Sequence, residues 1–251
     1  MKNLLFTVMM IQISINSVLA NSNMHQVIKA GKPIVIDGVK DKAWGQGAWQ
    51  PLNHLIVGVQ PDKNDFSGRY KLLWDEHYLY LFAEIVDDVL YDKTANPLVK
   101  YWDDDCLEVF IDEDNSGGDH LYNFNAFAYH VALDNQSVDI GRKSSDGDIE
   151  VLLLNEHIKS QWRRSFDNPR KIHWELAIKL FDDTFNPDVK NNEHVRLKEH
   201  KTIGFMLAYC DNDGSEFRES FVGSHAIKAV NGDKNLGYKT ADVFGKIVLI
   251  K

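Results

Sequence analysis

The stretch Tyr101-Trp102-Asp103-Asp104-Asp105-Cys106-Leu107-Glu108-Val109-Phe110-Ile111-Asp112 is the most informative part of the chain. Two aromatic residues precede an acidic turn, and the seven residues after that turn read as a β-strand. Side chains alternate between the two faces of a strand. One face therefore carries Leu107, Val109 and Ile111, and the opposite face carries Cys106, Glu108 and Phe110. Because the second face includes a carboxylate, we expect it to serve something other than the main core.

Short runs with period-two alternation recur on both sides of this strand, separated by clusters of Gly, Asn, Asp and Pro. Helical periodicity is nearly absent, and this combination is typical of all-β domains. The predicted strands are residues 33–36, 69–74, 78–86, 106–112, 171–180, 203–210 and 244–250, with a helical turn at 41–44. Residues 121–133 are predicted to form one long strand or a pair of strands. Segments 134–168 and 182–201 are polar and are predicted to be loops. We expect an antiparallel β-sandwich, similar to a jelly roll, with long decorated loops.

The first 20 residues have the composition of a secretory signal peptide. Lys2 precedes an apolar run from Leu4 to Ile15, and the segment ends in Val18-Leu19-Ala20, which is a small-residue cleavage site. The apolar run is shorter than the roughly 20 residues that span a bilayer. We expect residues 1–20 to be removed by cleavage near Ala20, leaving a secreted or periplasmic protein without a membrane span.

The rest of the chain, residues 21–251, is expected to form a single domain, because all-β domains of about 200–250 residues commonly fold as one unit. The 44% of hydrophobic and 11% of aromatic residues are enough for a substantial core. The net charge is −9, and loss of Lys2 with the signal peptide makes it −10. This charge disfavours nucleic acid and anionic membranes as partners, whereas a neutral ligand meets no electrostatic penalty. We expect a monomer.

Only two cysteines, Cys106 and Cys210, are present, and both lie in strand-like apolar segments. An exported location permits a disulfide between them. The alternative is a pair of buried free thiols that behave as small hydrophobic side chains. The sequence leaves both readings open.

An aromatic residue beside a strand carboxylate is a combination that binds sugars. The aromatic face stacks on the C–H surface of a pyranose, and the carboxylate accepts hydrogen bonds from vicinal hydroxyls. Such binding needs no activated nucleophile. Residues 101–112 therefore favour a site for carbohydrate.

The order and spacing of several fragments resemble the family-nine carbohydrate-binding modules, a group with DOMON-like β-sandwich folds. The fragments are Ile36-Asp37-Gly38 with Trp44, Leu73-Trp74-Asp75 with Leu79-Tyr80, then Trp102, Asp105, Glu108 and Phe110-Ile111-Asp112, and the closing segment Tyr238 to Leu249 with Phe244-Gly245. Each fragment is weak alone, but together they cover most of the chain after the signal peptide. The resemblance implies non-catalytic binding of a mono- or oligosaccharide or the end of a glycan chain.

In that family two aromatic side chains clamp one terminal sugar, usually at the reducing end, while a Glu and an Arg bond to its hydroxyls. The resemblance implies that Trp102 and Glu108 take the roles of first clamp and carboxylate, and that Tyr238 stands where the family typically has Trp. The family's Arg falls on or near His130, whose imidazole lacks the fixed fork of a guanidinium. Asp105, from the same motif, is a further candidate contact.

Each of these residues also has an ordinary structural interpretation. Trp102 and Tyr238 could pack in a core or under a loop, and Glu108 could be a solvent-facing strand residue. His130 could be a polar residue of the sheet. Only the positions of the side chains decide between the two interpretations.

Oxygen ligands alternate around the glycines of the loop that follows the strand, partly as in a calcium loop. The candidate ligands are Asp112, Asp114, Ser116 and Asp119, but Asn123 stands where a bidentate Glu would close an EF-hand. The alternative is a solvated turn. The resemblance adds weight to structural calcium, and Asp211 with Asp213 is a second, weaker candidate. No organic cofactor is expected.

Two other classes of function remain as alternatives. A glycoside hydrolase needs two carboxylates roughly 5–10 Å apart, whereas Glu108 and Asp112 lie about 13 Å apart along one strand. The chain could also be an accessory domain in polysaccharide breakdown. A haem or redox sandwich would take Met and His ligands, for which only Met24 and Met206 remain after cleavage.

Overall fold

The computed structural model describes residues 24–251, so the predicted signal peptide lies outside the described part. The first half of the chain contains strands β1 (His25–Lys29), β2 (Gln50–Leu52), β3 (His54–Gly58), β4 (Phe66–Trp74), β5 (Leu79–Asp87), β6 (Cys106–Asp112) and β7 (Phe127–Ala132). The second half contains β8 (Ser137–Lys143), β9 (Ile149–Leu153), β10 (Ile158–Arg164), β11 (Lys171–Ile178), β12 (Thr202–Asp211), β13 (Ser220–Gly223) and β14 (Gly245–Ile250). Two short 3-10 helices are η1 (Lys42–Gly45) and η2 (Ala241–Val243).

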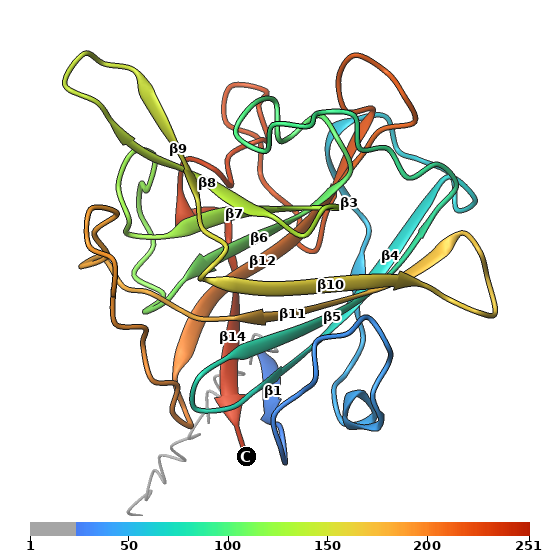
Figure 1. Ribbon diagram of the computed structural model, residues 1–251, viewed down its shortest axis with the longest axis horizontal. Coiled ribbons are helices and arrows are strands. Elements are labelled where there is room, and N and C mark those ends of the chain that lie inside the picture. Colours follow the sequence, from blue (N-terminus) through green and yellow to red (C-terminus); the bar gives the residue numbers. More distant parts are fainter. Residues whose placement is uncertain (1–23) are drawn as a thin grey trace, which may run out of the picture.

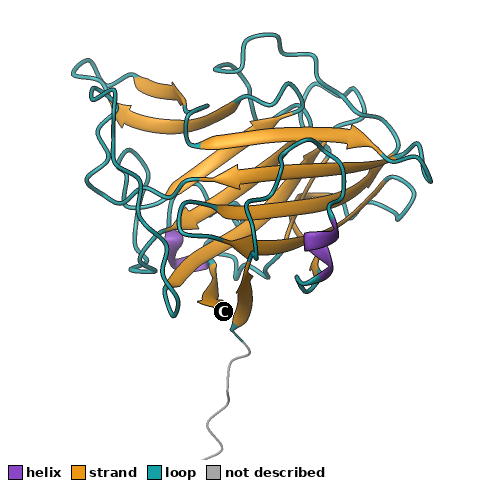
Figure 2. Ribbon diagram, turned by 60° about the horizontal axis from the view of Figure 1, so that its bottom comes forward, coloured by secondary structure: helices purple, strands orange, loops and turns teal. Residues whose placement is uncertain are grey.

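The strands pair in the order β10-β11-β5-β4-β1-β14-β12-β6-β7-β8-β9, with β2 beside β4 and β13 between β12 and β3. This continuous sheet folds over on itself into two layers, with the short helices at the periphery (Figures 1 and 2). The layers meet at β1 and β14, which lie side by side near the carboxyl terminus. The predicted β-sandwich class is confirmed.

The main core lies between the two layers, because its buried side chains come from both of them. Phe66 of β4 stacks on Tyr209 of β12 with ring centroids 5.0 Å apart, and Tyr70 packs on Phe205 at 5.8 Å. The predicted core face of β6 points into this cluster. Its other face joins a second cluster with Phe110 and Met206, outside the sandwich. The prediction that only one face of β6 serves the main core is therefore confirmed.

The pairing of β1 differs from the expected antiparallel arrangement. This strand runs parallel to β14, with His25 opposite Ile247, and parallel to β4, with Ile28 opposite Leu73. No strand was predicted at β1, because its five residues alternate only weakly between polar and apolar. Strand β1 joins the two layers, because it pairs with β4 on one edge and with β14 on the other. Backbone pairing on both edges therefore stabilises this strand, without a regular alternation of polar and apolar side chains.

The predicted strand 33–36 is wrong, and the segment is held by other contacts. Glu175 of β11 is fully buried and accepts hydrogen bonds from the backbone N–H of Asp37 and Gly38, each at 3.0 Å, and from Trp44 Nε1 at 2.8 Å. Gly38 has a φ of +74°, which its lack of a side chain allows. The chain therefore turns onto the outer face of the sheet instead of extending along it.

Two other predictions need correction. Segment 134–168 was expected to be a loop but contains β8, β9 and β10, whose charged and exposed positions hide the alternation. Segment 121–133 was expected to form one long strand or a pair of strands, but only β7 forms there. The hairpin of β4 and β5, the helical turn at Trp44, and the strands β6, β11, β12 and β14 agree with the predictions to within a few residues.

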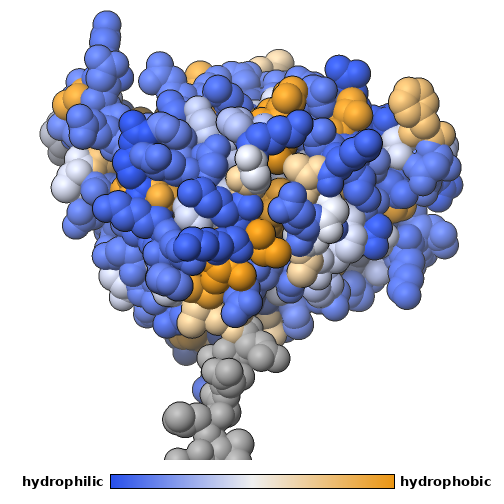
Figure 3. All heavy atoms as spheres, turned by 90° about the horizontal axis from the view of Figure 1, so that it is seen from below, coloured by the Kyte–Doolittle hydropathy of each residue, from blue (hydrophilic) through white to orange (hydrophobic). Residues whose placement is uncertain are grey.

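The face seen from below is mostly hydrophilic, with apolar side chains confined to small patches (Figure 3). Within residues 24–251, no helix has both the length and the apolar character needed to cross a membrane.

Candidate functional site

A pocket of about 610 Å³ opens beside β6. Its polar and aromatic lining consists of Lys100, Tyr101, Trp102, Glu108, His130, Arg218, Asn235 and Tyr238. Its apolar lining consists of Leu98, Val99, Ile140, Ile149 and Val151. Four residues predicted for a binding site, Trp102, Glu108, His130 and Tyr238, are thus brought together from three separate parts of the chain.

Glu108 forms the charged floor of the pocket and is only 3% exposed. Its Oε1 accepts hydrogen bonds from Arg218 at 2.8 Å and from Cys210 Sγ at 3.1 Å, and it lies 2.8 Å from His130 Nε2. Burial alone would raise the pKa of Glu108, but His130, Arg218 and Cys210 together lower it to about 2. Its Oε2 accepts no hydrogen bond from the described residues. Glu108 is therefore a carboxylate that can accept hydrogen bonds from a ligand.

Arg218 also lines the pocket, although it was not predicted as a site residue. It lies in the loop between β12 and β13, its guanidinium is 4.3 Å from the centre of the Phe221 ring, and it bonds Glu108. The resemblance placed the family's Arg on or near His130, and Arg218 supplies a guanidinium beside that histidine. Arg218 is the only Arg after residue 196, but no local pattern marks it as a site residue. Nothing in the sequence links it to Glu108, which lies 110 residues away.

Trp102 is 40% exposed and lies in a tight turn between β5 and β6. The turn is closed by a hydrogen bond from Asp103 N to Lys100 O at 3.0 Å, and Lys100 has a φ of +49°. Tyr101 is buried and meets Trp102 edge to face, with ring centroids 4.8 Å apart. The buried Tyr101 therefore supports an indole that remains open to the pocket.

Tyr238 lies in the loop between β13 and β14 and lines the same pocket. The preceding Gly237 sits so close to Phe110 and Met206 that an added Cβ would come within 2.8 Å of both side chains. Its carbonyl is also 2.8 Å from His120 Nε2. Gly237 thus lets the loop dock closely on the outer face of β6, which fixes the position of Tyr238.

Asp105 does not line this pocket. It is fully buried, and its two carboxylate oxygens accept hydrogen bonds from Tyr91 N at 2.7 Å and Asn212 N at 2.9 Å. Burial and the charge of Asp87 raise the pKa of Asp105 to about 9. The neighbouring Asp104 likewise accepts from backbone N–H groups of residues 93 and 94. The acidic turn therefore anchors the loop that carries Trp102, and its carboxylates do not line this pocket.

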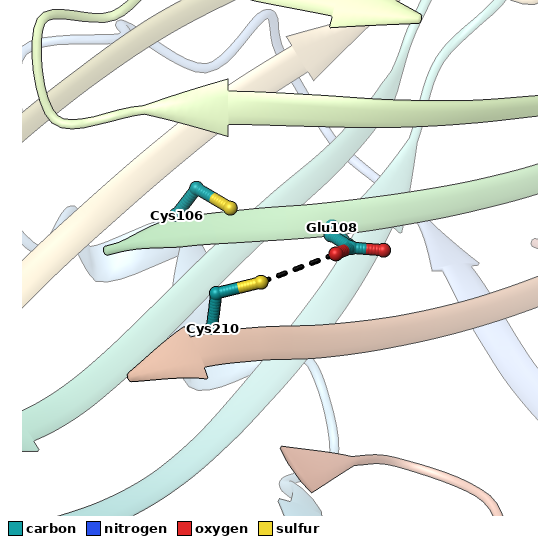
Figure 4. A group of neighbouring side chains, drawn as sticks. All are labelled: Cys106, Glu108 and Cys210. Carbon is teal, nitrogen blue, oxygen red and sulfur yellow. Dashed lines mark hydrogen bonds between the residues drawn. The ribbon is translucent and has the colours of Figure 1, made fainter. Parts of the chain in front are cut away.

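Cys106 and Cys210 are opposite each other on β6 and β12, and both are buried free thiols (Figure 4). With Glu108 they form a group whose ligand atoms lie within reach of one metal ion. However, Arg218 Nη1 lies 3.1 Å from Cys210 Sγ and 2.8 Å from Glu108 Oε1. The guanidinium therefore already supplies the positive charge that a metal ion would bring to Glu108. Burial also raises the pKa of both thiols, which disfavours the thiolates that bind metals. We interpret the pair as packing beneath Glu108.

The loop after β6, the first candidate for calcium, is organised by its own backbone. Asp112 accepts hydrogen bonds from Gly117 N at 2.7 Å and Ser116 N at 3.3 Å, and Asp114 accepts from Ser116 N at 3.0 Å. Asp119 pairs through its backbone with Thr240. These hydrogen bonds close the turn by side-chain capping, and calcium binding by this loop stays a prediction.

The alternative functions find little support in the described residues. Glu108 is the one carboxylate in the pocket lining, whereas hydrolysis of a glycoside needs a pair. Met206 is fully buried in the cluster outside the sandwich, and Met24 lies just before β1. Packing explains the position of Met206 without any haem.

The lowered pKa of Glu108 predicts a specific dependence of stability on pH. An unperturbed Glu titrates near pH 4.3 in the unfolded chain, so the ionised Glu108 stabilises the fold above that pH. This contribution is lost as the pH falls toward about 2. We expect the difference in unfolding free energy between wild type and Glu108→Gln to shrink between pH 5 and pH 2, as measured by urea unfolding. A constant difference would show that the carboxylate is not held ionised.

Known proteins are similar in sequence to this chain over parts of their length. The chain is 28% identical over 228 residues to endo-1,4-beta-xylanase C of Paenibacillus barcinonensis, an alignment that covers 90% of this chain and 17% of that protein. It is 39% identical over 92 residues to endo-1,4-beta-xylanase A of Thermotoga maritima, covering 37% of this chain and 8% of that protein. The chain thus spans only a small part of the curated relatives it matches.

Solved structures show the same fold. A carbohydrate-binding module of family 9 from Caldicellulosiruptor kristjanssonii in complex with cellotriose aligns with a TM-score of 0.63 at 18% identity, over 90% of this chain and 93% of that one. The module in complex with glucose aligns with the same score at 19% identity, over 89% of this chain and 95% of that one. The family model described as carbohydrate family 9 binding domain-like matches residues 36–251. The chain therefore belongs to the carbohydrate family 9 binding domain-like family.

Proposed function

We propose that this domain binds the terminal sugar of a glycan without chemical change, between the rings of Trp102 and Tyr238. The observation that carries the proposal is the shared pocket, in which an exposed indole, a phenol and a buried ionised carboxylate face one space. Aromatic rings bind the C–H faces of a pyranose, and charged groups bind its hydroxyls. The same residue types in this order suggested a sugar site from sequence alone.

Glu108 and Arg218 are the charged groups of the pocket that can bond to sugar hydroxyls. Glu108 Oε1 is occupied by Arg218, His130 and Cys210, so Oε2 is the atom that is free to accept a hydroxyl hydrogen. The Arg218 side chain is 10% exposed, and its guanidinium has further N–H groups that can donate to a sugar oxygen. A donor and an acceptor held side by side match two adjacent hydroxyls of one ring.

The solved family members support the choice of sugar. One structure is a complex with cellotriose and another is a complex with glucose, and both share this chain's fold. We propose a β-linked gluco- or xylo-oligosaccharide as the ligand, bound at its reducing end as the family resemblance implies. With one ring clamped, we expect a dissociation constant near the micromolar range.

A ligand series tests this proposal. Isothermal titration of residues 21–251 with glucose, cellobiose, cellotriose and xylobiose should give measurable binding to at least one sugar. Reduction of cellobiose with borohydride opens its terminal ring, so the alditol should bind at least tenfold more weakly. Equal affinity for cellobiose and its alditol would contradict binding of a closed terminal ring.

The same samples provide the control for catalysis. We expect every oligosaccharide to be recovered intact after prolonged incubation, because the pocket lining holds one carboxylate. Steady release of reducing sugar would favour the glycoside hydrolase alternative.

We further propose that the protein is exported, as the composition of residues 1–20 suggests, and that it acts as an accessory domain in polysaccharide breakdown. The xylanases to which it is similar support this role, since the matching region is a small part of each of them.

A further inference from the structure

One side of the sugar pocket carries no polar side chain. This aliphatic wall consists of Leu98, Val99, Ile140, Ile149 and Val151. All five side chains are at least partly exposed, and those of Val99 and Ile149 are 50% and 53% exposed. Apolar side chains that gather at an exposed place generally mark a contact surface. The wall is therefore a binding surface that one clamped sugar ring does not explain.

The register of the sheet places this wall beside the polar groups of the pocket. Glu108 of β6 is opposite His130 of β7, which is opposite Val138 of β8. Residues directly opposite each other point to the same face of a sheet, and so do residues two apart on one strand. Ile140 therefore shares this face, and it is opposite Val151 of β9. The outer face is polar over β6 and β7 and aliphatic over β8 and β9, which follow one another across the layer (Figure 1).

The spacing of the strands sets the distance from a clamped ring to the wall. Neighbouring strands lie about 4.7–4.9 Å apart, so β8 and β9 are roughly 10 and 14 Å from β6. A pyranose bonded to Glu108 thus leaves the wall free, within reach of a short substituent of the ring. The pocket of about 610 Å³ includes both regions, since Glu108 and the wall line it together. One ligand can therefore contact both.

The side chains of the wall indicate the chemistry of that substituent. Sugar hydroxyls placed against them would lose hydrogen bonds to water and gain none, which is unfavourable. The wall also offers no aromatic ring on which a second pyranose can stack. An apolar group, by contrast, gains free energy when it is buried there. If the reducing end is held in the clamp, the anomeric carbon is unsubstituted, and the apolar group is attached through another ring hydroxyl.

We propose that the pocket takes an O-acylated sugar, whose ring lies between Trp102 and Tyr238 and whose acyl chain lies against the aliphatic wall. This inference rests on the proposed function and names the class of sugar. Glu108 and Arg218 bind two hydroxyls of the ring, so the ester occupies a third. Binding breaks no bond in the ester.

Isothermal titration with matched sugars and esters tests the proposal. The probes are glucose, xylose, the 2-O- and 3-O-butyryl esters of each, and butyl β-glucoside. Each buried methylene strengthens binding roughly threefold, so at least one ester should bind residues 21–251 at least tenfold more tightly than its parent sugar. Butyl β-glucoside, whose reducing end is blocked, should not bind more tightly than glucose.

A double variant tests whether the acyl chain contacts the wall. Ile149→Thr with Val151→Thr keeps β-branched side chains in β9 but adds hydroxyls to the wall. The gain of the ester over its parent sugar should fall below about threefold in this variant. Val59→Thr is the matched control, because Val59 is exposed and lies outside the pocket lining, and it should keep the full gain. Circular dichroism during heating checks that both variants fold.

The possible results separate this inference from the function on which it rests. The inference alone is overturned if a parent sugar binds and none of its esters binds more tightly, or if the double variant keeps the full gain. A gain for butyl β-glucoside and not for the esters would place the apolar group at the anomeric carbon and contradict the acyl assignment. If no sugar and no ester binds, the proposed function fails and the inference fails with it.

Discussion

Replacing Trp102 with Ala is expected to lower the affinity for the sugar by more than tenfold while leaving the fold intact. Central aromatic residues of a binding site commonly contribute at least 2 kcal/mol when truncated, which is more than a factor of ten in dissociation constant. Because the indole is 40% exposed, its loss leaves little new cavity. Titration calorimetry measures the affinity, and circular dichroism during heating measures the fold.

The matched control for this variant is Phe166→Ala, since Phe166 is a fully exposed aromatic residue that does not line the pocket. It should bind sugar as the wild type does. Unchanged affinity in Trp102→Ala would show that the indole makes no contact with the ligand. Unfolding of that variant would show that Trp102 belongs to the packing of its loop.

The second large effect concerns stability. Arg218→Ala should lower the free energy of unfolding by about 3–5 kcal/mol, because it leaves the buried charge of Glu108 without its guanidinium partner. The side chains of Arg218 and Glu108 are 10% and 3% exposed, so water cannot replace the lost contact. Urea unfolding at pH 7 measures the change. Sugar binding should also be lost, because Arg218 lines the pocket.

Two variants make this test specific. Arg142→Ala removes an exposed arginine whose partners Asp188 and Glu150 are also exposed, and its unfolding should match the wild type. The double variant Arg218→Met with Glu108→Gln removes both charges and should recover most of the lost stability. If Arg218→Ala unfolds at the same urea concentration as wild type, Glu108 does not depend on the guanidinium.

Local patterns were enough to predict the strands that build the site. The period-two geometry of β6 separates Leu107, Val109 and Ile111 from the face that carries Glu108, so the direction of Glu108 away from the main core followed from periodicity. The strand β10 alternates less clearly because its polar positions face partly into solvent, and it was read as loop. Pairing to β11, which no local pattern reports, decides its structure.

The candidate site was predictable where a side chain acts from its own strand and unpredictable where contacts are long-range. Tyr101 and Trp102 look equivalent in sequence, but one supports the pocket and the other is open to it. Asp105 looked like a ligand residue because it is acidic and adjacent, whereas backbone N–H groups from residues 91 and 212 occupy its oxygens. Arg218 reaches Glu108 only after the β12–β13 loop folds back over β6.

A crystal structure of residues 21–251 grown with cellobiose is the most direct test of the proposed clamp. We predict electron density for one pyranose ring between the side chains of Trp102 and Tyr238, with a hydroxyl within hydrogen-bond distance of Glu108 Oε2. A sugar bound elsewhere on the molecule, with this pocket filled only by water, would contradict the account.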